Sequence, residues 1–253
     1  MPDPRFHIDA PLQAGARLRL DEADSRHAAT VLRLGPGDGV RVFNARDGEW
    51  RAEIDAKDRH GVQASVRTLL RSARPSPDLD LLFAPVKRDA TDLIVEKATE
   101  LGARRLIPII TTRTITDTVR VDRLASIARG AAAQTERFDI PEILSPLPLA
   151  KALDGWNSSR PLVFADEAGE DADKPWGGET GRAPPLLRAL GGLKPQAIAV
   201  LIGPEGGFDP AERRMLRALD FVMPVTLGPR ILRAETAVIA ALALVQAAWG
   251  DWT

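Results

Sequence analysis

"VLIGPEGGFDPAERRML", residues 200–216, decides the fold class of this chain. It begins with an apolar run typical of a buried strand, and an amphipathic helical pattern follows the glycines. A second stretch, "TLGPRILRAETAVIAALALVQAAW" (226–249), has the same arrangement around Gly228. Strand patterns at 79–86, 105–110 and 161–166 also alternate with helical patterns at 89–103 and 122–137. This alternation predicts an α/β domain with a parallel sheet over residues 75–253.

The first 74 residues have a different pattern, with short alternating runs typical of a small β-barrel or sandwich. "RVFNARDGEWRAEIDA" (41–56) predicts a hairpin around Ala-Arg-Asp-Gly, and 61–70 is another predicted strand. Residues 21–34 are more helical at their start. Prolines in 71–80 predict a linker. We therefore expect two domains, 1–74 and 75–253.

Composition excludes several classes of protein. The chain has 253 residues, no cysteine, three histidines and a net charge of −1. Disulfides, thiolate metal sites and a cysteine nucleophile are excluded, and no metal site is expected. The small net charge means that RNA binding would depend on local arginine patches. No apolar run approaches the ~20 residues that span a bilayer, and the start of the sequence lacks a signal pattern, so a cytoplasmic protein without a membrane partner is expected.

The loop at 203–207 does not have the features of a phosphate site. A P-loop needs a lysine and a hydroxyl after its glycines, and the dinucleotide motif needs another glycine spacing. Glu205 would repel a phosphate. Asp209, Pro210 and Glu212 fit a helix start that satisfies its own backbone donors through a capping box. A phosphate ligand is therefore not expected here.

The loops that follow the predicted strands would meet at one edge of the sheet, where open α/β folds bind ligands. Loops beginning near Gly203 and Gly228, with the strand end at Asp166 and Glu167, predict a pocket of backbone groups lined by Leu and Ile. Such a pocket suits a flat neutral heterocycle such as adenine better than a polyphosphate. The plainer interpretation is that these glycines only make tight turns.

The paired motifs "LIGPEGGF" and "LGPRILRAETA" resemble those of the 16S rRNA (uracil-N3)-methyltransferases, a family of the knotted SPOUT class. The resemblance extends along the whole chain, through "PRFHI" (4–8), "HAATVLRLGPGD" (27–38), "KRDATDLIVEKATELGA" (87–103) and "AAAQTERFDIPEI" (131–143). One departure is Ala133, which precedes Gln134 where members often carry an acid.

The resemblance implies a PUA-like β-barrel for RNA docking over 1–74 and a SPOUT methyltransferase domain with a trefoil knot over 75–253. It implies S-adenosyl-L-methionine as cofactor, a homodimer as working unit, and 16S rRNA of the 30S subunit as partner. The residues it assigns to the cofactor are Ile202, Gly203, Pro204, Glu205, Gly206, Gly207, Leu227, Gly228, Ile231, Leu232 and Thr236. Those it assigns to RNA are Arg5, His27, Arg33, Lys87 and Arg137.

Uridine N3 is a poor nucleophile until its proton leaves, and the negative charge then spreads onto the uracil oxygens. An arginine could stabilise that charge. Candidates are Arg230 and Arg233 beside the cofactor loop, and Arg113 and Arg137 are further candidates; the plainer interpretation of each is an ordinary salt bridge or a phosphate anchor. Glu205 is a candidate for a role near the sulfonium or the target base.

Two other functions remain open at this point. One is a ribose 2′-O-methyltransferase of the same class, which differs in the atom that is methylated. The other is a non-catalytic RNA-binding or assembly factor, which would not bind S-adenosylmethionine. A generic nucleotide-binding enzyme is disfavoured by the missing phosphate-loop lysine.

Overall fold

The computed structural model describes residues 3–116, 118–171, 173–174, 177–192 and 196–252. The chain divides into two compact units. The first unit comprises residues 1–75 together with 132–139, and the second comprises 76–131 and 140–253. Along the sequence, the first boundary between the two units falls in the proline-containing linker. Residues 132–139 also belong to the first unit, although they come after the linker. The sequence patterns did not predict this.

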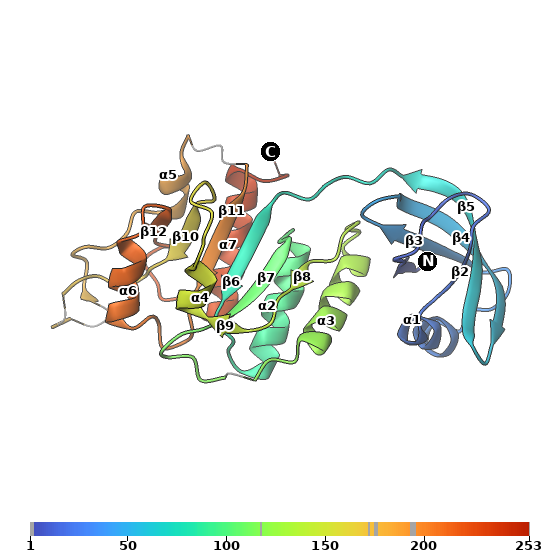
Figure 1. The fold of residues 1–253 in the computed structure, drawn as a ribbon, viewed down its shortest axis with the longest axis horizontal. Helices are drawn as coiled ribbons and strands as arrows, with labels where there is room; N and C mark the ends of the chain where they lie inside the picture. Colours follow the sequence, from blue (N-terminus) through green and yellow to red (C-terminus); the bar gives the residue numbers. More distant parts are fainter. Residues whose placement is uncertain (1–2, 117, 172, 175–176, 193–195, 253) are drawn as a thin grey trace. The chain divides into compact units, whose positions relative to one another are not determined.

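The first unit is built on a five-stranded sheet with strand order β1-β3-β4-β5-β2, seen in Figure 1. β1 pairs in parallel with β3, and the other pairs are antiparallel. The predicted hairpin is confirmed as β3 and β4, joined through residues 45–47. The elements are β1 (Arg5–His7), β2 (Arg17–Arg19), α1 (Glu22–Arg26), the π-helix η1 (His27–Val31), β3 (Gly39–Asn44), β4 (Gly48–Asp58) and β5 (Gly61–Arg71).

The second unit contains the predicted parallel sheet, whose order is β12-β10-β11-β6-β7-β8, with β9 also paired to β7. All of these pairs are parallel. Its strands are β6 (Leu79–Phe83), β7 (Arg105–Ile110), β8 (Glu142–Ile143), β9 (Leu147–Pro148), β10 (Leu162–Ala165), β11 (Ile198–Ile202) and β12 (Val222–Val225). Its helices are α2 (Arg88–Glu100), α3 (Val121–Gln134), α4 (Leu149–Leu153), α5 (Leu186–Leu190), α6 (Pro210–Arg217) and α7 (Ala234–Ala248).

Helices cover both faces of this sheet, because successive strand residues point to opposite sides. Leu81 and Val200 pack on one face with α2, α3, α5 and α7. Leu82 and Leu201 pack on the other with α4 and α6. Strands buried on both faces read as continuous apolar runs, which explains why the sequence pattern identified them.

Helix α7 is the most apolar helix of the second unit, as the sequence predicted. Its Gln246 is fully buried, and the side-chain amide donates to the carbonyl of Leu101 at 2.7 Å. This bond ties α7 to the end of α2. The opposite side of α7 is open to solvent, and Ile239 there is 36% exposed.

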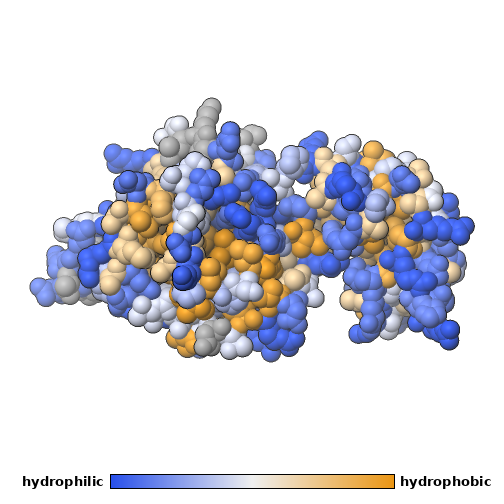
Figure 2. All heavy atoms as spheres, in the orientation of Figure 1, coloured by the Kyte–Doolittle hydropathy of each residue, from blue (hydrophilic) through white to orange (hydrophobic). Residues whose placement is uncertain are grey.

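Apolar side chains also reach the surface of the second unit. Figure 2 shows them in the area of β7 and β9, among polar side chains. None of the helices in the described part of the chain combines the length and the apolar character needed to cross a bilayer.

Candidate functional site

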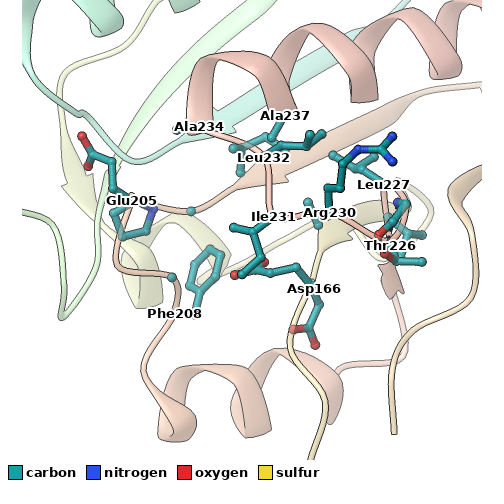
Figure 3. A pocket seen from close by; sticks show the side chains of 18 residues that line it. Asp166, Glu205, Phe208, Thr226, Leu227, Arg230, Ile231, Leu232, Ala234 and Ala237 are labelled. Carbon is teal, nitrogen blue, oxygen red and sulfur yellow. Dashed lines mark hydrogen bonds between the residues drawn. The ribbon is translucent and has the colours of Figure 1, made fainter. Parts of the chain in front are cut away.

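Three loops at the carboxyl edge of the parallel sheet enclose a cavity of about 60 Å³, which we call the loop cavity. They follow β10, β11 and β12, which are neighbours in the sheet. The lining residues are Ala165, Asp166, Glu167, Ile202, Gly203, Pro204, Glu205, Gly207, Phe208, Val225, Thr226, Leu227, Gly228, Arg230, Ile231, Leu232, Ala234 and Ala237. The two glycine-containing motifs of the sequence therefore lie on opposite sides of one cavity, drawn in Figure 3.

Three glycines of these loops cannot be replaced without strain, and one of them is Gly207, whose φ is +66°. A Cβ atom on Gly203 would lie 2.6 Å from Cε2 of Phe208, which is buried. Gly228 has a φ of +125°, a conformation that L-residues rarely adopt, and a Cβ there would meet no atom within 4 Å. The backbone at Gly228 is thus bare on the side where a side chain would otherwise stand.

The loop from Gly203 to Asp209 is held at Gly206 and at its Asp209 end. The predicted capping box of α6 is confirmed: the Asp209 carboxylate accepts from the Ala211 N–H, and Glu212 accepts from the Asp209 N–H. Glu212 also accepts from the Thr112 N–H at 2.8 Å. The Arg113 guanidinium donates to the carbonyl of Gly206 at 2.9 Å. The segment after β7 therefore braces this loop.

Asp166 fixes the loop that follows β10. Its side chain is 2% exposed and accepts from Arg213 Nε at 2.8 Å and from Arg217 Nε at 2.7 Å. Because both arginines lie on α6, the β10 loop is held against that helix. The charge of Asp166 is compensated, so it adds little net charge to the cavity.

Among the lining residues that the structure describes, the carboxylates Glu167 and Glu205 outnumber the cation Arg230. Burial raises the pKa of the Glu167 carboxyl, and its own backbone N–H and the neighbouring Arg213 act against that shift. Glu167 Oε1 lies 3.3 Å from the position of a Cβ on Gly207. A cationic or neutral ligand fits this distribution of charge, and a polyphosphate does not.

Models of two protein families match the chain. An RNA methyltransferase domain matches residues 74–246, and an RNA methyltransferase PUA domain matches residues 20–67. A ribosomal RNA small subunit methyltransferase E from Rickettsia conorii is 30% identical over 96% of this chain and 94% of its own length. The chain belongs to the ribosomal RNA small subunit methyltransferase E family. Its first unit accordingly contains a PUA-like domain.

Solved structures of similar proteins agree with this membership of the methyltransferase E family. A methyltransferase E from Neisseria gonorrhoeae, bound to S-adenosyl methionine, superposes with a TM-score of 0.83 and 28% identity, covering 99% of this chain and 100% of that one. A putative methyltransferase from Legionella pneumophila, in complex with the bound cofactor SAM, has a TM-score of 0.81 and 27% identity over 99% of this chain and all of that one.

Most residues that the sequence assigned to the cofactor lie around the loop cavity of this methyltransferase E family member. Those that line it are Ile202, Gly203, Pro204, Glu205, Gly207, Leu227, Gly228, Ile231 and Leu232. Gly206 faces Arg113 instead, and Thr236 is exposed on α7. Neither of these two is part of the cavity wall.

The candidate catalytic residues surround the loop cavity without all pointing into it. Arg230 is exposed and lines the cavity, whereas Arg233 is exposed at the N-cap of α7. Figure 3 shows the Glu205 side chain pointing away from Phe208 and Ile231. The Arg113 guanidinium donates to the backbone carbonyl of Gly206. Of the three candidate arginines, Arg230 is therefore the one that lines the described part of the cavity.

Two residues that the sequence assigned to RNA have their charges engaged within the first unit. The Arg5 guanidinium donates to the carbonyls of Ala132, Ala133 and Arg137 at 2.9–3.0 Å and lies 3.4 Å from Glu49. Its side chain is 1% exposed, so it has no surface to offer to RNA. The Arg137 side chain is 8% exposed and pairs with Asp139 at 2.6 Å.

The other three RNA candidates are exposed. Lys87 occupies the N-cap position of α2, and His27 begins the π-helix η1. Arg33 has a φ of +58°, which costs about 1–2 kcal/mol for a residue with a Cβ. Val31, two residues before Arg33, is 65% exposed. The His27 ring makes an edge contact with Phe6, and the exposed parts of the three candidate side chains can meet a partner.

The sequence placed Glu167 at the predicted pocket, because it follows the end of a predicted strand in the same way as the two glycine loops, and Glu167 does line the loop cavity. Sequence patterns did not single out Phe208 and Thr226, which also line it. Phe208 has no such signal, since its position depends on close contact with Gly203 and on the ring of Phe164, whose centroid lies 5.0 Å away.

Proposed function

We propose that this protein transfers a methyl group from S-adenosyl-L-methionine to N3 of a uridine in 16S ribosomal RNA. The observation behind the proposal is the loop cavity, which is closed by the two glycine loops, is negative, and has no lysine for a phosphate. Two relatives of the same fold were solved with this cofactor. A relative named as a small subunit methyltransferase supports the ribosomal substrate.

The residues of the loop cavity fit this cofactor. The bare backbone at Gly228 and the side chains of Leu227 and Leu232 suit the edge and faces of an adenine ring. Glu167 suits the positive charge of the sulfonium half. Arg230 and Ile231 are exposed at the rim of the cavity.

When bound, S-adenosylmethionine supplies an electrophilic methyl group. The protein has to hold the base in line with that group and to favour loss of the N3 proton. Arg230 is placed to stabilise the negative charge of the uracil oxygens, and removal of one such donor typically costs ~10²–10³-fold in rate. Arg113 acts by holding Gly206, and Arg233 provides a second cation at the start of α7. Glu205 is exposed beside these residues, and its role near the target base stays a prediction.

The RNA would contact the exposed His27 and Arg33 of the first unit and Lys87 of the second. Arg5 and Arg137 are left out of this interface because their side chains are buried. The protein contains 5% aromatic residues and no tyrosine, so phosphate contacts and RNA shape should contribute more than stacking.

A homodimer would cover the open side of α7. Thr236, Ile239, Ala240, Ala243 and Ala247 recur at intervals of three or four residues on that side, and all are at least partly exposed. The trefoil knot that the resemblance implies stays a prediction. A cytoplasmic location, which a ribosomal substrate would require, also stays a prediction.

Calorimetric titration with S-adenosylmethionine and with ATP tests the cofactor. Saturable heat with the first ligand alone is expected, and absence of binding would favour a non-catalytic RNA-binding or assembly factor. Incubation with 30S subunits and with free 16S rRNA, followed by nuclease digestion and mass spectrometry, tests the reaction. A methyl group on the base at N3 is expected, whereas a methyl group on the ribose would show a 2′-O-methyltransferase.

For the cationic residues, Arg230→Ala should reduce the single-turnover rate with little change in cofactor affinity. Arg113→Ala should weaken cofactor binding as well, because it releases Gly206. Full activity in the Ala variants of Arg113, Arg230 and Arg233 would remove the proposed role of arginine.

A further inference from the structure

A second cavity, of about 220 Å³, lies in the second unit between the starts of two helices. We call it the α2–α3 cavity. Its walls come from the segment after β6, the first turns of α2 and of α3, and the residues before α3. In Figure 1, the first turns of α2 and α3 lie at the same end of the second unit's parallel sheet. None of the residues assigned to the cofactor lines it.

The α2–α3 cavity and the loop cavity adjoin at the sheet. β6 and β11 are neighbouring parallel strands, so the segments that follow them leave the same edge. The N–H of Ala84 donates to the carbonyl of Ile202 at 3.0 Å. Ile202 lines the loop cavity, and Pro85, directly after Ala84, lines the α2–α3 cavity. One backbone hydrogen bond thus joins the two walls.

The chemistry of the α2–α3 cavity combines an apolar inner wall with a cationic rim. Val86 and Leu124 are buried there, and Val119 is half-buried beside them. Such a wall suits the face of a planar base.

The charged residues at the rim differ in their pairing. Arg123 forms an ion pair with Asp92 that links α2 to α3, and Arg120 pairs with Asp122 at the surface. Arg88 is exposed, and its side chain makes no ion pair or hydrogen bond with the residues that the structure describes. It is therefore free to meet a phosphate.

We propose that the α2–α3 cavity receives a nucleotide of the RNA substrate, with its base against Val86, Val119 and Leu124 and its phosphate on Arg88. This inference rests on the proposed function, because it treats the neighbouring loop cavity as the cofactor site. The position explains how an RNA strand could be held beside the methyl donor while the first unit contacts the RNA elsewhere. The ion pair between Arg123 and Asp92 forms one wall of the site, and it is fixed because it links α3 to α2.

The first test is the salt dependence of RNA affinity. Fluorescence anisotropy with a labelled hairpin from the small-subunit RNA is measured at several salt concentrations. Arg88→Ala should weaken binding and reduce the slope of log affinity against log salt by about 1, as expected for one lost phosphate contact. Arg188→Ala is the matched control, since Arg188 is exposed on α5 and lines neither cavity. An unchanged slope in Arg88→Ala would overturn the proposal.

The second test locates the base. Hairpins that carry one 4-thiouridine at each uridine in turn are photo-crosslinked to the full chain and mapped by mass spectrometry. Crosslinks within residues 85–92 or 116–124 support the proposal, and crosslinks confined to other segments contradict it. A change in sedimentation rather than RNA affinity in Arg88→Ala would instead identify a protein interface and overturn it. Cofactor titration separates the two ideas. A wild-type protein that does not bind S-adenosylmethionine would count against the proposed function, whereas Arg88→Ala should bind the cofactor as tightly as the wild type, because Arg88 does not line the loop cavity.

Discussion

Gly203 lies so close to the ring of Phe208 that a methyl group on Gly203 would come within 2.6 Å of Cε2. Phe208 is held in turn by the edge-to-face contact with Phe164. The size of the loop cavity therefore depends on the absence of one side chain.

Gly203→Ala should push the Phe208 ring into the loop cavity. Overpacking of this kind typically costs 1–3 kcal/mol, so a lower Tm and at least ~10-fold weaker binding of S-adenosylmethionine are expected. Gly206→Ala is the control, because its Cβ would lie 3.6 Å from Arg113 Cβ, an ordinary contact. Calorimetry and thermal unfolding measure both effects. Equal losses in the two variants would contradict this account of the cavity.

Glu167→Gln should change stability in a pH-dependent way. Burial raises the pKa of Glu167, so the folded protein disfavours the ionised form. This cost is absent at pH values below the ordinary range of a glutamate and is complete once the pH exceeds the raised value. The variant should therefore unfold at a higher temperature than the parent at pH 8 and at the same temperature at pH 4.

Thermal scans between these pH values provide the measurement for Glu167→Gln. Glu205→Gln supplies the comparison, since it replaces a carboxyl that also lines the loop cavity but is exposed. A Tm difference for Glu167→Gln that does not vary with pH would show that burial does not disfavour the ionised carboxyl of Glu167.

Arg5→Met should destabilise the first unit rather than weaken RNA contacts directly. It would remove the guanidinium that donates to the carbonyls of Ala132, Ala133 and Arg137. Glu49 would keep its hydrogen bonds from Arg41 and Arg71. A buried acceptor that loses its donor typically costs about 1–3 kcal/mol. Urea unfolding measures the change. A fully stable Arg5→Met protein with reduced RNA affinity would restore the RNA role that the sequence suggested.

Arg33→Gly should stabilise the first unit and weaken RNA binding, the opposite of the result expected for Arg5→Met. The φ of +58° at Arg33 is unstrained for glycine, and the gain should be roughly 0.5–1 kcal/mol after allowing for the greater freedom of glycine in the unfolded chain. RNA affinity should fall because an exposed cation is lost. Urea unfolding and RNA anisotropy in parallel give both quantities, with Arg33→Asn as the variant that keeps a side chain. Unchanged RNA affinity would remove Arg33 from the interface.

Ile239→Asp should shift the protein toward the monomer if the open side of α7 is covered by a second copy. A carboxylate in an apolar interface is costly to desolvate. Sedimentation velocity across a dilution series measures the equilibrium. Ala248→Asp, at the exposed end of the same helix, is the comparison. A wild-type protein that sediments as a monomer at all concentrations would rule out the dimer.

Sequence patterns predicted the long elements because each has a clear period or a continuous apolar run. They did not predict β8, β9 or α4, which have two to five residues each. Such short elements depend on pairing with β7 and packing against the sheet, which local sequence does not encode. α3 also ends at Gln134, before the predicted end at residue 137.

The loop cavity was predictable in outline because strand ends of a parallel sheet converge at one edge. Its details were not, since Phe208 and the pKa of Glu167 depend on contacts between loops distant in sequence. The burial of Arg5 has a similar cause. The family resemblance assigned Arg5 to RNA, and only the structure shows the carbonyls of 132–139 that take up its donors.

The return of residues 132–139 to the first unit has a consequence for protease digestion. A single nick in the linker between Arg71 and Leu79 would leave both fragments associated under native conditions, because the later fragment still provides the carbonyls that Arg5 binds. A recombinant piece that stops at residue 75 would lack part of its own structure, so grafting this module onto another enzyme requires the later octapeptide as well.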